Sequence, residues 1–141
     1  MQDGGIEDQL INTSKEVKID KYSTGQIGEK IATEFLRKNG YKILEHNFLL
    51  RNGEIDIIAI DNAEKDKVLV FIEVKTRKSA KFGTPLEAIG YYKLKALINA
   101  SQVYKISHRG LPDALRIDAI AIILDESNEI SSLEHIKNIS G

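Results

Sequence analysis

The spacing of apolar residues predicts a helix near the N-terminal end of the chain. Ile27, Ile31 and Phe35 recur every four residues, which places them along one face of a helix. Ser23 precedes this run, and Gln26 stands three residues after it, as in a capping box at a helix N-terminus. The helix is expected to end at the next asparagine–glycine pair, because glycine readily adopts the left-handed conformation that closes helices.

Strand-like patterns dominate the middle of the chain. Runs rich in valine and isoleucine occupy residues 41–50, 54–60 and 67–77, separated by short polar turns. A second helical stripe covers roughly 86–105, and a continuous apolar run at 115–124 predicts a buried strand. The order of helix, three strands, helix and strand predicts an α/β or α+β fold in which helices flank a central mixed sheet.

The two ends of the chain lack such periodicity. Residues 1–22 are polar and charged, and we expect a flexible N-terminal tail there. Residues 23–125 are expected to form one domain, since 141 residues suffice for a single core. The C-terminal tail at 126–141 is predicted to carry a short helix around 133–137 that packs on the domain.

The second and third strands are expected to pair as an antiparallel hairpin around the polar loop between them. If Ile60 lies opposite Leu69, the same register places Asp56 opposite Glu73. Opposed side chains in such a pair have Cβ atoms about 4.5–5.5 Å apart, a separation at which two carboxylates can share a cation. A slip of one residue would move one acid to the other face, so the register is a specific prediction.

The third strand carries an acid and a lysine on one face, because strand side chains alternate: Glu73 and Lys75 point one way and Val74 the other. Two carboxylates and an ammonium group on an apolar hairpin are costly to bury unless they are paired or bind a metal. Asp56 and Glu73 would suit Mg²⁺ or Mn²⁺, with the Val74 carbonyl as a candidate third ligand. Lys75 would then stabilise charge on a phosphate. The alternative is a set of cross-strand ion pairs on a solvated face.

Composition restricts the chemistry and the compartment. There are no cysteines, which excludes disulfides and thiolate metal sites, and the three histidines are not spaced for zinc. No apolar run approaches the roughly 18 residues that span a membrane, and the first residues do not have the pattern of a signal peptide. We therefore expect a cytoplasmic protein without a membrane partner.

The charge distribution favours an anionic partner, although the net charge is only −1. Between Lys75 and Arg109, eight basic residues stand against one acid. Such a stretch beside a pair of carboxylates can attract a phosphate backbone, whereas the plainer alternative is a solvated helix face and a charged loop. The residues expected to contact nucleic acid are Arg77, Lys78, Lys81 and Lys95.

Several sequence blocks resemble the YraN family of bacterial proteins over roughly residues 24–124. These blocks are GQIGEKIA at 25–32, GEIDIIA at 53–59, FIEVKTR at 71–77, FG at 82–83 and the helix that carries Lys93. The family is largely uncharacterised and is similar to the PD-(D/E)XK nuclease superfamily, which includes archaeal Holliday-junction resolvases. The resemblance implies a restriction-endonuclease-like core more firmly than it implies an activity.

The resemblance also implies roles for five residues. Asp56 matches the metal-binding aspartate of the superfamily, Glu73 the second acid and Lys75 the lysine of the motif. Glu29 on the first helix matches an acid placed near the metal, and Lys93 matches a basic or amide position that faces the site. Each of these last two has a simpler interpretation, as a solvated acid in the first turn of a helix and as a lysine at the edge of the core.

Three further features carry less weight. The proline that usually precedes the aspartate of the motif is replaced by Glu54-Ile55, and Glu54 could be a second acid near the site or could close the hairpin turn. Asp118 on the last strand is interpreted as structural. Tyrosines could stack on nucleic-acid bases, but their positions on apolar stripes and at helix boundaries favour packing in the core or at its edge. They are Tyr22, Tyr41, Tyr91, Tyr92 and Tyr104.

Taken with the resemblance, these patterns predict a metal-dependent endonuclease that hydrolyses phosphodiester bonds in DNA, including structured DNA. One alternative is a catalytically inactive nucleic-acid-binding module that retains the nuclease fold, and another is a protein-interaction domain. The enzyme would require Mg²⁺ or Mn²⁺. It could act as a homodimer, as many relatives of this fold do.

Overall fold

The computed structural model describes residues 23–51, 53–63, 65–79, 87 and 89–141. The predicted tail at 1–22, the candidate Lys81 and the predicted helix start at Leu86 lie outside these residues.

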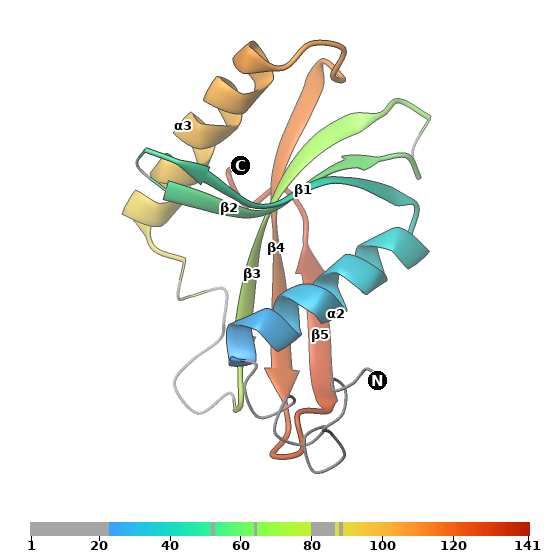
Figure 1. Ribbon diagram of the computed structural model, residues 1–141, viewed down its shortest axis with the longest axis vertical. Helices are drawn as coiled ribbons and strands as arrows, with labels where there is room; N and C mark the ends of the chain where they lie inside the picture. The colour runs from blue at the N-terminus through green and yellow to red at the C-terminus, as the bar shows by residue number, and fades with distance from the viewer. Residues whose placement is uncertain (1–22, 52, 64, 80–86, 88) are drawn as a thin grey trace, which may run out of the picture.

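The fold is α+β, with a five-stranded mixed sheet and two helices (Figure 1). The helices are α2 (Thr24–Lys38) and α3 (Tyr91–Ser107), and the strands are β1 (Tyr41–Leu50), β2 (Gly53–Asp61), β3 (Val68–Arg77), β4 (Ala114–Leu124) and β5 (Ile130–Ile136). The strands are ordered β1-β2-β3-β4-β5; β3 and β4 run parallel, and all other neighbours are antiparallel. This is the expected mixed sheet, consistent with a restriction-endonuclease-like core.

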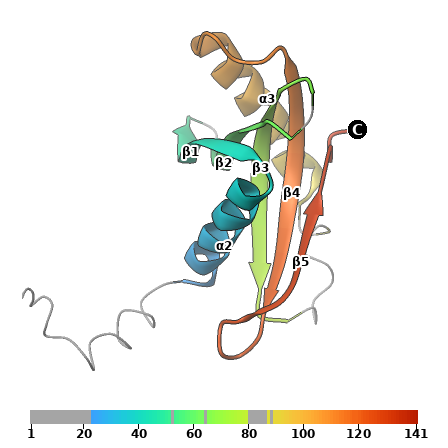
Figure 2. The same ribbon diagram turned by 90° about the vertical axis from the view of Figure 1, so that its right-hand side faces the viewer.

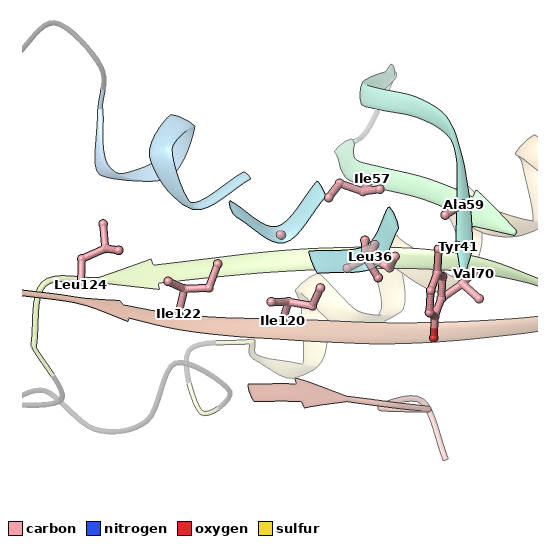
Figure 3. Packing of buried hydrophobic residues seen from close by; sticks show 10 residues of the cluster. Leu36, Tyr41, Ile57, Ala59, Val70, Ile120, Ile122 and Leu124 are labelled. Carbon is pink, nitrogen blue, oxygen red and sulfur yellow. The ribbon is translucent and has the colours of Figure 1, made fainter. Parts of the chain in front are cut away.

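The two helices cover opposite faces of the sheet. Successive side chains of a strand point to opposite faces, so each strand contributes apolar residues to both sides. In β3, Val70 and Ile72 belong to the buried cluster beneath α2, whereas Leu69 and Phe71 belong to the cluster beneath α3. Figure 3 shows the first cluster, in which Leu36 of α2 lies against β3 and β4. Figure 2 shows α2 lying along its side of the sheet. In the described part of the chain, neither helix has the length and apolar character needed to span a bilayer.

The first helix begins and ends as predicted. The Ser23 hydroxyl accepts a hydrogen bond from the Gln26 amide at 3.1 Å, and the Gln26 side chain accepts one from the Ser23 amide at 2.9 Å. Gly28 lets the helix approach β3 closely, since a Cβ there would lie 1.8 Å from Oγ1 of Thr76. This contact fixes the first turns of α2 over the C-terminal part of β3.

The register between β2 and β3 is the predicted one, with Ile60 opposite Leu69. The paired ladder ends at Ile57 and Ile72, so Asp56 and Glu73 do not form the next cross-strand pair. Beyond this point β3 remains paired with β4 through Arg77. The acids therefore lie where one strand leaves its neighbour, which frees backbone groups for side chains to bind.

The second helix starts later than predicted. It begins at Tyr91, after Gly90 in an extended conformation that acts as the N-cap, so the prediction that placed Ile89 and Gly90 inside this helix is wrong. Glycine is costly inside a helix because it loses more conformational freedom than other residues, and this favours a helix boundary. The predicted apolar stripe is confirmed in the later turns of α3, where Leu97, Ala100 and Tyr104 are buried.

The predicted C-terminal helix is also wrong. The segment forms β5, which pairs antiparallel with β4 and sets Leu133 opposite Ile122 and His135 opposite Ile120. A helix of five residues has too few internal hydrogen bonds to be stable, whereas the edge of β4 offers a full row of partners. The folded unit therefore extends past residue 125 and includes most of the predicted tail.

Candidate active site

Glu73 is the centre of the candidate site. It lies on β3 with only 3% of its surface exposed, on the side of the sheet covered by α3. Its Oε2 atom is 3.5 Å from Nζ of Lys75 on the same strand and 3.7 Å from Nζ of Lys93 on α3. Lysines from two elements thus converge on one buried carboxyl group, as expected for Lys93 if its head reaches an anion.

Asp56 lies beside this group at the end of the β2–β3 ladder. Its Oδ2 atom accepts a hydrogen bond of 2.8 Å from the backbone N–H of Val74, a donor that the departing strand leaves without a ladder partner. This bond holds the Asp56 carboxylate against β3 in place of a main-chain pairing. Val74 thus contributes its amide here, and a role for its carbonyl as a ligand stays a prediction.

The electrostatic environment of Glu73 is unusual. Burial raises its pKa, the nearby negative charge of Asp56 raises it further, and Lys93 and Lys75 lower it only in part, so that the pKa is about 7. Its Oε1 atom is buried and has no hydrogen-bond partner among the described residues. A buried acceptor without a partner costs about 1–3 kcal/mol, so this oxygen is available to a ligand.

Glu29 of α2 lies near enough to Asp56 to be affected by its charge. It is half-buried, and its pKa is raised by burial and then by the charge of Asp56, whereas a hydrogen bond with the Asn47 side chain lowers it. Glu54 raises the pKa of Glu29 as well. The acids from α2, β2 and β3 are therefore near enough to influence one another, which fits the predicted placement of Glu29.

The described residues include no group of three acidic or histidine side chains that could hold one metal ion. The protein's own ligands would thus be the pair Asp56 and Glu73. This fits Mg²⁺, which usually keeps several waters and binds through one or two carboxylates. The unpartnered Glu73 oxygen is the observation that supports a cation in this position.

Asn47 lies near the site, where its side chain forms a hydrogen bond with Glu29, and the sequence patterns did not predict this role. It lies within β1, between the residues that face Ile55 and Ile57, and so opposite Asp56. Its φ of 48° is in the left-handed region, which asparagine tolerates better than most residues. An asparagine inside a strand-like run is the signal that could have marked it.

The predicted nucleic-acid contacts fall in two places. Arg77 follows Glu73 and Lys75 on alternate positions of β3, and Lys78 is exposed just beyond the strand. Lys95 lies on α3 with its ammonium 5.9 Å from the centre of the Tyr91 ring, in a cavity separate from the carboxylates. The structure therefore groups the first two with the site and places the third beside it.

Asp118 belongs to a buried ionic network on the α2 side of the sheet. Arg116 donates to it at 2.8 and 3.0 Å, and His135 lies 2.8 Å away. Arg116 also contacts Asp61 and the Tyr41 hydroxyl. Burial alone would raise the pKa of Asp118, but hydrogen bonds from His135 and Arg116 hold it below the usual value. This complete pairing supports the structural interpretation.

The tyrosines divide into two groups. Tyr41 and Tyr104 are buried as expected, at 6% and 3% exposure. Tyr91 and Tyr92 are 69% and 83% exposed, so packing in the core or at its edge is the wrong expectation for them. They occupy the first turn of α3, whereas the buried residues of this helix begin at Leu97.

Comparison with known proteins adds the family. A family model described as "Uncharacterised protein family UPF0102" matches residues 28–122, a segment that contains Glu29, Asp56, Glu73, Lys75 and Lys93. A UPF0102 protein of Caldanaerobacter subterraneus subsp. tengcongensis is 41% identical over 122 residues, which cover 86% of this chain and 97% of the relative. One from Alkaliphilus oremlandii is 44% identical over 116 residues, or 81% and 94% of the two chains. The matches confirm the family resemblance of the sequence blocks.

Proposed function

Because the chain belongs to the uncharacterised protein family UPF0102, whose name carries no activity, we propose a function from the site itself: metal-dependent hydrolysis of phosphodiester bonds in DNA. The observation that carries the proposal is the buried Glu73 carboxyl group, set beside Asp56 and contacted by two lysines. Perturbed carboxyl groups of this kind concentrate at functional sites.

The two acids and the two lysines would have different roles in the reaction. Asp56 and Glu73 would hold Mg²⁺ or Mn²⁺, which when bound polarises a phosphate and lowers the pKa of water. Lys75 and Lys93 place positive charge beside the carboxylates, where it can stabilise the negative charge that develops on a phosphate during attack. Both lysines are partly exposed, at 26% and 39% of their side chains, so a backbone phosphate can reach them.

The charge around the site supports a polyanionic substrate. Arg77 and Lys78 continue the line of β3 beyond Lys75 and would contact the phosphate backbone. The alternative, an inactive binding module, has no use for two acids beside the anionic backbone that it must attract. We therefore place hydrolysis ahead of binding alone. The choice of structured DNA rests on the superfamily resemblance.

A cleavage panel tests the proposal. Linear, flapped and four-way DNA are incubated with the protein and Mn²⁺ or Mg²⁺, and products are resolved on denaturing gels. We expect metal-dependent cutting that falls about a hundredfold or more in Asp56→Asn and in Glu73→Gln. Asp113→Asn, an exposed acid before β4, is the matched control and should cut like the wild type.

Lys75→Met refines the test. Because Lys75 would act on the phosphate and not on the metal, this variant should lose cleavage while it retains Mn²⁺ binding. The proposal fails if no substrate is cut with either metal, or if the Asp56 and Glu73 variants cut as well as Asp113→Asn.

A further inference from the structure

A cavity lies between α3 and the end of the hairpin formed by β1 and β2. Figure 1 shows this end of the hairpin beside α3. Its volume of about 340 Å³ falls in the range of small-ligand sites. The residues that define it, here called the α3 shelf, are Leu50, Arg51, Tyr92, Lys95, Asn99 and Val103. None of these six residues was expected to share a pocket, because they come from the hairpin and from successive turns of the helix.

The α3 shelf combines cations with an exposed aromatic ring. Arg51 and Lys95 bring two positive charges, and the described lining includes no acid. Tyr92 is 83% exposed and contacts only the edge of the Tyr91 ring among aromatic neighbours in the described chain. Asn99 adds an amide that can donate and accept hydrogen bonds. Such a set matches a ligand with a flat ring and a phosphate.

The shelf adjoins the candidate active site. Gly53, Ala96 and Ala100 line both the shelf and a smaller cavity that Lys93 also lines. Lys93 in turn contacts Glu73. A strand of nucleic acid that reaches the carboxylates therefore passes the shelf within a short stretch of backbone.

We propose that the α3 shelf binds an unpaired nucleotide of the substrate, with its base stacked on Tyr92 and its phosphate between Arg51 and Lys95. This inference rests on the proposed function, whose substrate class it narrows to DNA with unpaired bases near the cut. In a continuous duplex both faces of each base are covered by neighbours, so only an unpaired base can offer a face to Tyr92.

The apolar part of the shelf suggests a competing occupant, a second copy of the chain. Val103 lines the shelf, and Leu49 and Ile106 are 73% and 85% exposed nearby in sequence. Two cations without a compensating acid in the lining favour the nucleotide, because a self-association surface would bring these like charges towards each other.

The test measures binding without chemistry. Fluorescence anisotropy in EDTA compares a fully paired duplex with a duplex of the same length that carries a five-nucleotide gap. We expect tighter binding to the gapped DNA, and Tyr92→Ala should weaken that binding about fivefold or more while changing affinity for paired DNA less than twofold. Tyr92→Phe, which keeps the ring, should bind gapped DNA like the wild type, and so should Ile106→Ala on the same helix.

Two binding results would overturn the inference, and a third outcome, given last, would do so while leaving the hydrolytic function intact. One is equal weakening of gapped and paired binding by Tyr92→Ala, with unchanged thermal stability. The other is a dimer, detected by analytical ultracentrifugation, that Tyr92→Ala dissociates while the preference for gapped DNA persists. This result would assign the shelf to contacts between copies of the chain. Loss of cleavage in every assay, with a Tyr92-dependent preference for gapped DNA intact, would reject the hydrolytic function and support the shelf. Cleavage without any effect of Tyr92 on binding would reject the shelf alone.

Discussion

Glu73 is a buried carboxyl group whose neighbours act on its pKa in opposite directions. Burial and the charge of Asp56 raise the pKa, and Lys93 and Lys75 oppose them without cancelling them. With a pKa of about 7, the group is neither fully ionised nor fully protonated near neutral pH. An added cation would favour the ionised form, so binding of a metal and ionisation of Glu73 are linked.

A neutral replacement of Glu73 should stabilise the metal-free protein. The pKa of Glu73 is raised from 4.5 to about 7 in the folded protein. The contribution of Glu73 to the free energy of unfolding is therefore fully present below pH 4.5 and is lost as the pH rises through 7. The loss amounts to about 3 kcal/mol at pH 8, and Glu73→Gln should recover it there but not at pH 4. Urea unfolding in EDTA at both pH values measures this, with exposed Glu126→Gln as an unaffected control. A destabilised Glu73→Gln at pH 8 would contradict the prediction.

Side-chain alternation along one strand places two of the candidate site residues together. It places Glu73 and Lys75 on one face, and the misfit of Lys93 within an apolar stripe marks a lysine that reaches inward. The partners of Asp118 could not be found in this way, since Tyr41 and Arg116 are 75 residues apart and meet only through the sheet. The exposure of Tyr92 could not be found either, since it depends on how α3 packs on the sheet, which no local pattern records.

The element that brings Glu29 to the other acids is α2, which contacts β3 closely. A Cβ at Gly28 would lie 1.8 Å from Oγ1 and 2.8 Å from Cβ of Thr76, so the helix would have to move away from the strand. The next residue is Glu29, whose pKa is raised by burial and then by the charge of Asp56. The distance between α2 and β3 therefore controls both packing and the acidic cluster.

Gly28→Ala should destabilise the protein, although alanine normally favours a helix. Overpacking against Thr76 should cost about 1–3 kcal/mol of unfolding free energy. Gly25→Ala is the matched control, because its Cβ would meet only Ser23 at 3.8 Å, and it should be neutral or mildly stabilising. Denaturant midpoints compare the two variants. Equal stability of both would show that the helix is not held at this distance by Gly28.

The elements were predicted well where a local signal exists. The capping box, the hydrophobic stripe and the hairpin register follow from neighbouring residues and are found in the structure. The start of α3 and the strand β5 were missed for different reasons. The helix begins only after its N-cap Gly90, although the apolar stripe in the sequence starts before it. The strand β5 gains its hydrogen bonds from β4, which its own sequence does not record.

At the scale of the whole molecule, β5 completes the sheet and the ionic network. It supplies His135 to Asp118, and the Asn138 amide that follows it donates to the same carboxylate at 3.0 Å. Asp118 is fully buried, so these donors compensate the burial of its charge. The C-terminal segment is thus part of the fold on which the site rests.

Deletion of residues 126–141 should therefore unfold or strongly weaken the domain. Loss of partners to a buried charge costs about 3–5 kcal/mol, and the lost pairing along β4 adds to it. Circular dichroism melts of the full and shortened chains measure the effect. Deletion of residues 140–141 alone serves as the control and should melt like the full chain. A shortened chain with an unchanged midpoint would show that β5 is dispensable.

The most direct test of the central claim, that Asp56 and Glu73 hold one cation, is calorimetric titration with Mn²⁺. We predict a single site in the wild type, with proton release at pH 7 that diminishes at pH 8.5 because Glu73 is then already ionised. Asp56→Asn and Glu73→Gln should each bind at least about tenfold more weakly, while Asp113→Asn binds as the wild type does. A wild type without measurable binding, or Asp56 and Glu73 variants that bind like Asp113→Asn, would contradict the account.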